Sequence, residues 1–452
     1  MAENTNLNLR NQVIYQIFVR QYSEEGTFEA VRRDLDRIRD LGVDIIYFAP
    51  IYPIGEAARK GSWGSPYSIR DYRAVDPAYG TMDDFKNLVS DIHARGMKCM
   101  LDIVYNHTSR DSVLVSEHPE WFYHKEDGSL GNRIGDWTDV ADLDYSHADL
   151  WDYQIQTLVD WAQIVDGFRC DVAPLVPLDF WKKARAEVSK VRPDCIWMAE
   201  SVEPSFIRYC RSLGIPALSD SELYQAFDID YDYDISDTFY AAVEGKTPLS
   251  ELAAAINQQE TIYPAGYIKL RCLENHDRAR AAFLFPNREA LLNWTAFIYF
   301  QKGIAMLYAG QEFCNVLHPS LFEREPFSRR TGDDLTSFLK RLFVIRKNPT
   351  LTDSSYHVSA CPGNFLVAEH VENKAVERTG AKVSSEGRRL IGIFSCDGRP
   401  GLVKLCGRGP EEGAVLSAPI EDGTYENLID HESYQVYEGH LSSKGLPVIF
   451  GR

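Results

Sequence analysis

The sequence predicts an α/β protein: a closed (β/α)8 TIM barrel with a short lid subdomain after the third strand and a C-terminal antiparallel β domain. Over roughly the first 345 residues, short apolar runs alternate with helix-length amphipathic segments, the pattern of parallel strands joined by helices. About eight such strand–helix units fit this length, which favours a closed barrel. Beyond residue 351 the helical period gives way to short strand-like runs, typical of an antiparallel domain.

Three strands are predicted near the N-terminus, at residues 13–19, 44–50 and 98–105. After the first, apolar residues recur at helical spacing over 28–41, and Gly42 suits the C-terminal cap of that helix. Thr81 to Asp84 resembles a capping box, and the helix that it starts is expected to end at Gly96. Strand and helix signals therefore alternate from the start of the chain.

The remaining strands are predicted at residues 167–172, 195–199, 219–223, 267–273 and 304–308, and the one at 219–223 is poorly marked. An open, doubly wound sheet is the structural alternative. No Gly-rich phosphate loop follows the first strand, so dinucleotide binding lacks its usual signal.

These signals divide the chain into three parts. Residues 1–107 and 147–349 form the predicted catalytic barrel, and residues 350–452 form a β-sandwich domain. The segment 108–146 is rich in His, Asp, Gly and Trp and too long for an ordinary connection, so it is the predicted lid. The charged stretch 372–389 is expected to be a solvated hairpin or loop.

Composition narrows the range of partners. A formal net charge of -18 argues against nucleic acid, anionic membranes and phosphorylated polymers, because surfaces that bind phosphate need clustered Lys and Arg. No secretory signal or apolar run of about 18 residues is visible, which favours the cytoplasm, or secretion if the chain is a mature form. The 9 Cys are scattered without C-x-x-C pairs and are expected to be reduced core residues.

Two carboxyl groups follow neighbouring predicted strands in contrasting surroundings. Arg169 and Asp171 share a strand face, and a guanidinium keeps a nearby carboxylate ionised and oriented, which suits a nucleophile. The pair alone would more simply be a structural ion pair. Glu200 directly follows the apolar run 195–199, where burial would raise its pKa and suit a general acid.

This pair fits the cleavage of a glycosidic bond. One carboxyl protonates the leaving oxygen, and in the retaining route a second attacks the anomeric carbon from about 5 Å away. Adjacent strands lie about 4.8 Å apart, so Asp171 and Glu200 meet that requirement. Asp277, beside His276 after a later strand, is placed to hold sugar hydroxyls in the transition state.

Four separated motifs occur in order along the chain. They are Asp102-Ile103-Val104-Tyr105-Asn106-His107, Gly167-Phe168-Arg169-Cys170-Asp171, Glu200 after its strand, and Asn275-His276-Asp277. With them the chain resembles the α-amylase family of glycoside hydrolases over nearly its whole length. Asp142-Leu143-Asp144 is similar to the family's P-D-L-D segment, with Ala141 in place of the Pro.

The resemblance implies residue roles and a substrate. The implied catalytic residues are Asp171 as nucleophile, Glu200 as acid/base and Asp277 as transition-state stabiliser. The implied residues that bind the attacked sugar are His107, Arg169, His276 and Tyr67, the last by stacking. The implied reaction is retaining hydrolysis of α-1,4-glucosidic bonds in malto-oligosaccharides or soluble starch fragments.

The residues after Asp171 depart from the family pattern. Many α-amylases carry Lys-His there, and the His carbonyl helps to hold calcium, whereas this chain has Val172 to Leu175. The lid is also short, so no cofactor is expected, and calcium stays an open alternative because Asn106 is present. Asp-Val-Ala at 171–173 is more similar to neopullulanase-type relatives, which implies that α-1,6 bonds are also candidate substrates.

Three other functions remain open at this stage. An α-glucosyl transferase would use the same residues, with a sugar hydroxyl instead of water resolving the intermediate. A non-catalytic carbohydrate-binding member should lack a carboxylate, and none is missing. A metal-dependent hydrolase should show H-x-H or H-E-x-x-H spacing around His107 or His276, and neither occurs. Oligomeric state is not indicated.

Overall fold

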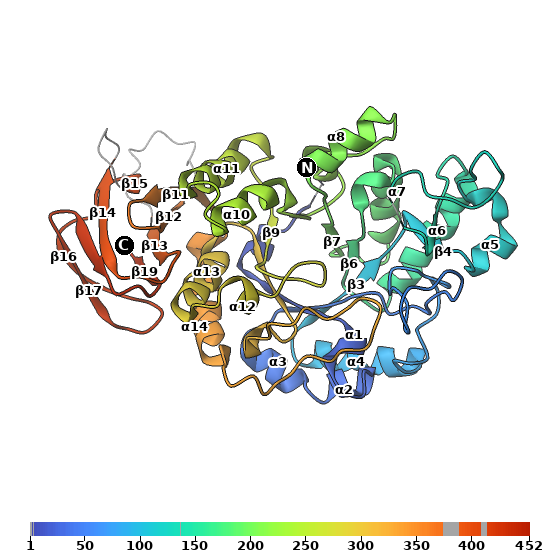
Figure 1. Ribbon diagram of the computed structural model, residues 1–452, viewed down its shortest axis with the longest axis horizontal. Coiled ribbons are helices and arrows are strands. Elements are labelled where there is room, and N and C mark those ends of the chain that lie inside the picture. The colour runs from blue at the N-terminus through green and yellow to red at the C-terminus, as the bar shows by residue number, and fades with distance from the viewer. Residues whose placement is uncertain (1, 3, 136, 374–387, 408–413) are drawn as a thin grey trace.

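The computed structural model describes residues 2, 4–135, 137–373, 388–407 and 414–452 (Figure 1). Eight parallel strands close into a barrel in the order β1-β10-β9-β8-β7-β6-β3-β2, which confirms the predicted fold class. The strands are β1 (Val13–Ile17), β2 (Ile45–Phe48), β3 (Lys98–Ile103), β6 (Gly167–Cys170), β7 (Ile196–Ala199), β8 (Ile229–Tyr231), β9 (Lys269–Arg271) and β10 (Ile304–Tyr308).

The barrel strands are buried on both faces, which explains their nearly continuous apolar runs. One set of side chains, including Ile14, Tyr47 and Met100, packs in a separate cluster with other barrel residues. The alternate residues, such as Tyr15 and Ile46, belong to the large cluster that includes the surrounding helices. Because successive side chains of a strand point to opposite faces, the barrel is stabilised by two apolar cores, one inside it and one between the strands and the helices.

The strand predicted at 219–223 is wrong. These residues form helix α9 (Asp220–Leu223), which begins at a capping box between Ser219 and Glu222. The true sixth strand is β8, where Asp228 and Asp230 interrupt the apolar pattern. Both are buried because cations neutralise them: Arg185 lies 2.7 Å from Asp228, and Lys269 lies 3.2 Å from Asp230.

Helices surround the barrel (Figure 1). The predicted helix over 28–41 is broken into α2 (Phe28–Arg32) and α3 (Leu35–Leu41), and Gly42 caps α3 in the left-handed region at φ +97°. Thr81 caps α4 (Met82–Ala94) with the predicted capping box. The other helices are α1 (Val19–Tyr22), α6 (Ala148–Ala162), α7 (Leu178–Val188), α8 (Pro204–Ser212), α10 (Ser236–Val243), α11 (Leu249–Ile262), α12 (Ala281–Leu284), α13 (Arg288–Phe300) and α14 (Thr336–Arg346).

The segment after β3 leaves the barrel and returns at α6. It pairs β4 (His107–Ser109) with β5 (Val140–Asp142) in an antiparallel ribbon. Between them lie α5 (Val113–Glu117) and a 3₁₀ turn, η2 (Pro119–Trp121). Because the ribbon starts at His107, the lid carries one of the predicted site residues directly into the barrel mouth.

The C-terminal region contains two sheets around a separate apolar cluster. One holds β11 (Ser354–Cys361), β12 (Phe365–Glu372), β13 (Arg389–Ser395) and β19 (Val448–Gly451). The other holds β14 (Gly401–Gly407), β15 (Ala414–Leu416), β16 (Gly423–Glu426), β17 (Ser433–Tyr437) and β18 (His440–Ser443). All described pairs are antiparallel except β14 with β15. Most of the charged stretch 372–389 lies outside the described residues.

Two asparagines on barrel helices bind the first C-terminal sheet, which lies beside α11 and α13 in Figure 1. Asn257 on α11 donates to the Val358 carbonyl and accepts from the Val358 N–H, both at 2.8 Å. Asn293 on α13 accepts from the Ser395 N–H at 2.8 Å and donates to the Gly445 carbonyl at 2.9 Å. Side-chain amides thus continue backbone hydrogen bonding between barrel and sheet. No described helix is both long and apolar enough to cross a membrane.

Candidate active site

Arg169 on β6 is fully buried and contacts three carboxylates. Its Nη1 donates to Asp102 Oδ1 and to Asp171 Oδ1, each at 2.9 Å. Its Nη2 lies 2.6 Å from Glu200 Oε1. One cation therefore fixes acids supplied by β3, β6 and β7, including both carboxyls predicted to react.

Strand register explains why Asp171 and Glu200 meet. Cys170 pairs with Ala199 across β6 and β7, so the next residue on each strand leaves the barrel at the same height. The Asp171 N–H donates to the Ile103 carbonyl at 2.8 Å. Because adjacent strands lie about 4.8 Å apart, the two carboxyls leave the barrel side by side.

The two carboxyls have raised pKa values. Burial, then the charge of Glu200, raises the pKa of Asp171 against the opposing effect of Arg169. Burial raises the pKa of Glu200 as well, although Arg169 opposes it. The expectation that Arg169 decides the ionisation of Asp171 was therefore incomplete, because burial and the second acid outweigh the cation. Two close carboxyls titrate as a pair and not as independent groups.

His276 organises the opposite side of the site. Gln16 Nε2 lies 2.7 Å from its Nδ1, and an amide nitrogen can only donate, so the imidazole proton is on Nε2. That Nε2 lies 2.5 Å from the Tyr67 hydroxyl and 3.0 Å from Asp277 Oδ2. The Tyr67 hydroxyl in turn donates to Asp102 at 3.1 Å. A continuous hydrogen-bond chain thus joins Gln16 to the acid that holds Arg169.

Asp277 is the ionised carboxylate of the site. Burial opposes its charge, but His276 and then Arg169 outweigh burial and lower its pKa to about 2. Its side chain is 40% exposed, the most open of the three predicted catalytic acids. A permanent negative charge therefore faces the cavity from the side of β9.

Tyr67 and His107 are placed against the cavity in different ways. The Tyr67 ring stacks on His276 at 5.3 Å between centroids. The His107 Nδ1 lies 3.1 Å from Asn106 Nδ2, so its Nε2 carries the proton. Burial lowers the pKa of His107 to about 4, and the ring is neutral at pH 7. Its remaining N–H is available to donate to a sugar hydroxyl.

A cavity of 290 Å³ opens at this end of the barrel. Six of the seven predicted site residues line it, namely Tyr67, His107, Asp171, Glu200, His276 and Asp277. Arg169 does not line the cavity and acts from beneath, through its contacts with the acids. The structure therefore brings all seven predicted residues together.

Sequence reasoning missed several other cavity-lining side chains, among them Lys60, Trp137, Asp139 and Phe322. Lys60 Nζ lies 2.8 Å from Asp139 Oδ1, which joins the loop after β2 to the lid. The Trp- and Asp-rich composition of the lid was a signal for Trp137 and Asp139. Lys60 and Phe322 lie in long connections without a motif, so nothing in the sequence pattern marked them.

Arg20 holds two of the loops that form the cavity wall. This residue is only 2% exposed. Its guanidinium donates to the carbonyls of Trp63 and Gly64 in the loop after β2, and to the Leu321 carbonyl in the loop after β10. These bonds neutralise no partner charge, and their role is to keep the loops adjacent.

Val172 has an unusual backbone conformation next to the proposed nucleophile. Its φ of +41° and ψ of +43° lie in the left-handed region, which a β-branched side chain rarely adopts. The same geometry directs the Val172 N–H to Glu200 Oε2 at 2.8 Å. Strain at this residue, of order 1–3 kcal/mol, is therefore coupled to the orientation of the acid.

The described residues near Asn106 and the lid do not fit a calcium ion. Both Asp142 oxygens accept hydrogen bonds, from the Asn132 amide and from the Arg133 N–H, and burial raises the pKa of Asp142. The Arg133 guanidinium lies 3.3 Å from Asp144 and donates to the Leu143 carbonyl. A fixed cation already neutralises this segment, and calcium would need six to eight free oxygen ligands.

Comparison with known proteins agrees with this geometry. The model of the α-amylase catalytic domain matches residues 10–334, and that of the bacterial α-amylase C-terminal domain matches residues 370–450. The crystal structure of an α-amylase from Lactobacillus plantarum superposes with a TM-score of 0.91 at 43% identity, covering 99% of this chain and 100% of that one.

Curated relatives are longer proteins. An α-amylase of Haloarcula japonica is 28% identical over 320 residues, which cover 67% of this chain and 44% of the relative. An α-1,4-glucan:maltose-1-phosphate maltosyltransferase of Burkholderia pseudomallei is 34% identical over 227 residues, which cover 44% of this chain and 20% of the relative. The chain thus spans less than half the length of either relative.

Proposed function

The chain belongs to the α-amylase family, and from that membership we propose that it is a retaining glycoside hydrolase of α-1,4-linked malto-oligosaccharides or soluble starch fragments. The observation that carries the proposal is the Arg169 guanidinium bound to Asp102, Asp171 and Glu200 at the mouth of a closed barrel. A structural ion pair would need one acid. Two further acids on the same cation, both facing a cavity, indicate a reacting pair.

In the first step Asp171 attacks the anomeric carbon while Glu200 donates its proton to the leaving oxygen. The C–O bond to the leaving sugar breaks, and a glycosyl ester forms on Asp171. The raised pKa of Glu200 favours the protonated form that this step needs, and the Arg169 bond fixes the direction of the Asp171 oxygens. Arg169 acts here as a positioning residue.

In the second step Glu200, now ionised, removes a proton from water as the water attacks the same carbon. The ester bond breaks, Asp171 is released as a carboxylate and the sugar leaves with its original α configuration. Asp277 is ionised throughout, and its charge favours the positively charged oxocarbenium-like transition state. The neutral His107 N–H and the His276–Tyr67 pair are placed to hold hydroxyls of the attacked sugar.

Incubation with maltotriose to maltoheptaose, pullulan, cyclodextrins and isomaltose tests this proposal. We expect hydrolysis of the malto-oligosaccharides with the α-anomer released first. Nuclear magnetic resonance identifies this anomer if spectra are recorded before mutarotation. An initially β product would exclude the retaining route. Cleavage of pullulan or isomaltose would extend the proposal to α-1,6 bonds.

A glucosyl transferase is the second candidate, supported by the similarity to the maltosyltransferase over 227 residues. The first step is the same, and a sugar hydroxyl replaces water in the second. High acceptor concentration distinguishes the two, since a transferase lengthens products while a hydrolase still releases reducing ends.

We also propose a reducing compartment as the site of action. The cysteines whose side chains the structure describes form no disulfide, and most of them are buried.

A further inference from the structure

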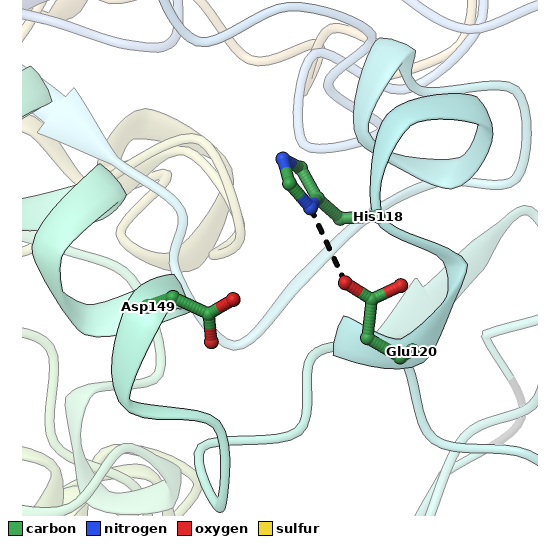
Figure 2. A group of neighbouring side chains, drawn as sticks. All are labelled: His118, Glu120 and Asp149. Atoms are coloured by element: carbon green, nitrogen blue, oxygen red, sulfur yellow. Dashed lines mark hydrogen bonds and ion pairs between the residues drawn. The ribbon is translucent and has the colours of Figure 1, made fainter.

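His118, Glu120 and Asp149 lie close together and do not line the cavity (Figure 2). His118 ends α5 and Glu120 lies in η2, both in the lid, whereas Asp149 lies in the first turn of barrel helix α6. One possible ligand atom from each lies within 4.8 Å of the other two. In Figure 2 the Asp149 carboxylate faces the two lid side chains across a gap.

The imidazole of this group is held in position. His118 Nδ1 lies 3.2 Å from Glu120 Oε1, close to the ligand spacing of a tetrahedral zinc site with bonds of about 2.0–2.1 Å. The His118 ring stacks on Trp121 at 3.7 Å between centroids and 6° between planes. A stacked ring loses little further freedom when it binds an ion, so the site is partly organised in advance.

A second observation points into the same group. Trp121 is 2% exposed, and its indole nitrogen is buried without a well-aligned hydrogen bond in the described structure. That N–H is directed at the Asp149 carboxyl, and it is the donor that the lid offers to this group. The carboxylate is therefore turned toward the lid, where His118 and Glu120 lie.

We propose that His118, Glu120 and Asp149 form a binding site for a divalent transition cation, zinc in the first instance, that joins the lid to α6. The group supplies one imidazole nitrogen and two carboxylates, with a charge that a divalent ion neutralises. Mixed nitrogen and oxygen ligands favour zinc, whereas calcium and magnesium take oxygen ligands. Water completes the tetrahedron, because all three ligands lie at the surface.

The location gives the site a structural role. Glu120 and His118 lie in the connection between β4 and β5, and that ribbon carries His107 and Val140 to the cavity. A cation bound to both the lid and α6 would add one cross-link to the native state that the unfolded chain lacks. Zinc should therefore raise the melting temperature.

Calorimetric titration of the chelator-treated full-length protein with zinc chloride tests the proposal without any substrate, so its outcome is independent of the proposed hydrolysis. We expect one saturable equivalent and a higher melting temperature. His118→Ala and Asp149→Asn should each weaken binding about tenfold or more and abolish the shift in melting temperature. Calcium should bind much more weakly than zinc.

A matched control is available in the C-terminal region. His431 Nδ1 lies 2.5 Å from Glu426 Oε1, a similar surface pair that belongs to no three-ligand group among the described residues. His431→Ala should leave the zinc isotherm unchanged. The metal-free melting temperature of each variant should match wild type, which shows that all are folded. Absence of a saturable equivalent, or its retention in both His118→Ala and Asp149→Asn, would overturn the proposal.

Discussion

Asp171 and Glu200 share one guanidinium, yet the roles proposed for them require opposite protonation states. Burial raises the pKa of both carboxyls, the charge of Glu200 adds to the rise at Asp171, and Arg169 opposes the rise at each. At the residue scale the site therefore behaves as one titrating unit, and substitutions at the two positions should have different consequences.

Asp171→Asn should abolish turnover while the fold stays intact. The amide keeps the size of the side chain but cannot form the glycosyl ester, so kcat should fall by about 10⁴-fold or more. Melting temperature and circular dichroism should remain close to wild type. Substantial residual hydrolysis by a sequence-verified preparation would contradict the assignment of Asp171 as nucleophile.

Glu200→Gln should separate the acid from the nucleophile. Hydrolysis of malto-oligosaccharides should fall by about 10²–10⁴-fold, because the leaving oxygen is no longer protonated. A maltosyl fluoride, whose leaving group needs no proton, should retain more of its rate. The pH profile of kcat for the Glu200→Gln variant should lose the alkaline limb that Glu200 causes.

The acid limb of that profile should move to lower pH, because loss of the Glu200 charge removes one of the causes that raise the pKa of Asp171. A profile with the wild-type shape would contradict the shared titration.

At the scale of single elements, the sequence correctly predicted features that depend on interactions between residues close together in the chain. The capping box at Thr81 and the cap at Gly42 were found because each satisfies backbone groups within a few residues. The sixth strand was missed because its aspartates are buried against Arg185 and Lys269, partners distant in sequence. Tertiary ion pairing had overridden the local pattern.

The residues of the site also fall into those that the sequence predicts and those that it does not. Its seven predicted residues follow strands or lie in motifs, so their convergence follows from barrel topology. Lys60 and Phe322 reach the cavity through loop packing that Arg20 maintains, and loop conformation has no period that a sequence reveals. The sequence also led us to expect that Arg169 would keep Asp171 ionised, whereas burial raises the pKa of Asp171. The extent of burial depends on neighbours that the sequence does not reveal.

His370 on strand β12 leads to a prediction about how stability depends on pH. This ring is buried, with Nε2 2.7 Å from the Phe300 carbonyl and Nδ1 2.8 Å from Ser354 Oγ, and burial lowers its pKa to about 3. The unfolded chain has the ordinary value near 6.5, so it binds a proton first as pH falls. Stability present above pH 6.5 should therefore decline toward pH 3, by about 2–3 kcal/mol between pH 7 and 4.5.

His370→Gln should flatten this dependence, because Gln offers a donor and an acceptor but does not titrate. Urea unfolding at pH 7, 5.5 and 4.5 measures it. If the free energy of unfolding falls equally with pH in the variant and in wild type, the acid sensitivity arises from other residues.

At the scale of the whole molecule, the barrel and the C-terminal sheets are joined by hydrogen bonds that neither part makes alone. Asn293 is fully buried, and its amide satisfies the backbone groups of Ser395 and Gly445. Such bonds couple the two parts, so we expect them to unfold together.

Asn293→Ala should lower the free energy of unfolding by about 2–4 kcal/mol, because a buried N–H and a buried carbonyl both lose their partner. Asn257→Ala, at a half-buried site with the same two-bond arrangement, should cost less. Urea unfolding followed by circular dichroism compares the two. A single transition in wild type that splits in Asn293→Ala would confirm the coupling, and an unchanged midpoint would contradict it.

The pairing of β1 with β10 also has a consequence for the order of assembly. Val13 lies opposite Ala305, so the barrel closes only when the two ends of its sequence meet, and the carbonyl of Leu321 that Arg20 requires comes later still. Contacts of such sequence separation form slowly. At about 5–20 residues per second, a ribosome completes Leu321 about 8–30 seconds after Asp171. For that interval the nascent chain carries the proposed nucleophile without a finished cavity around it.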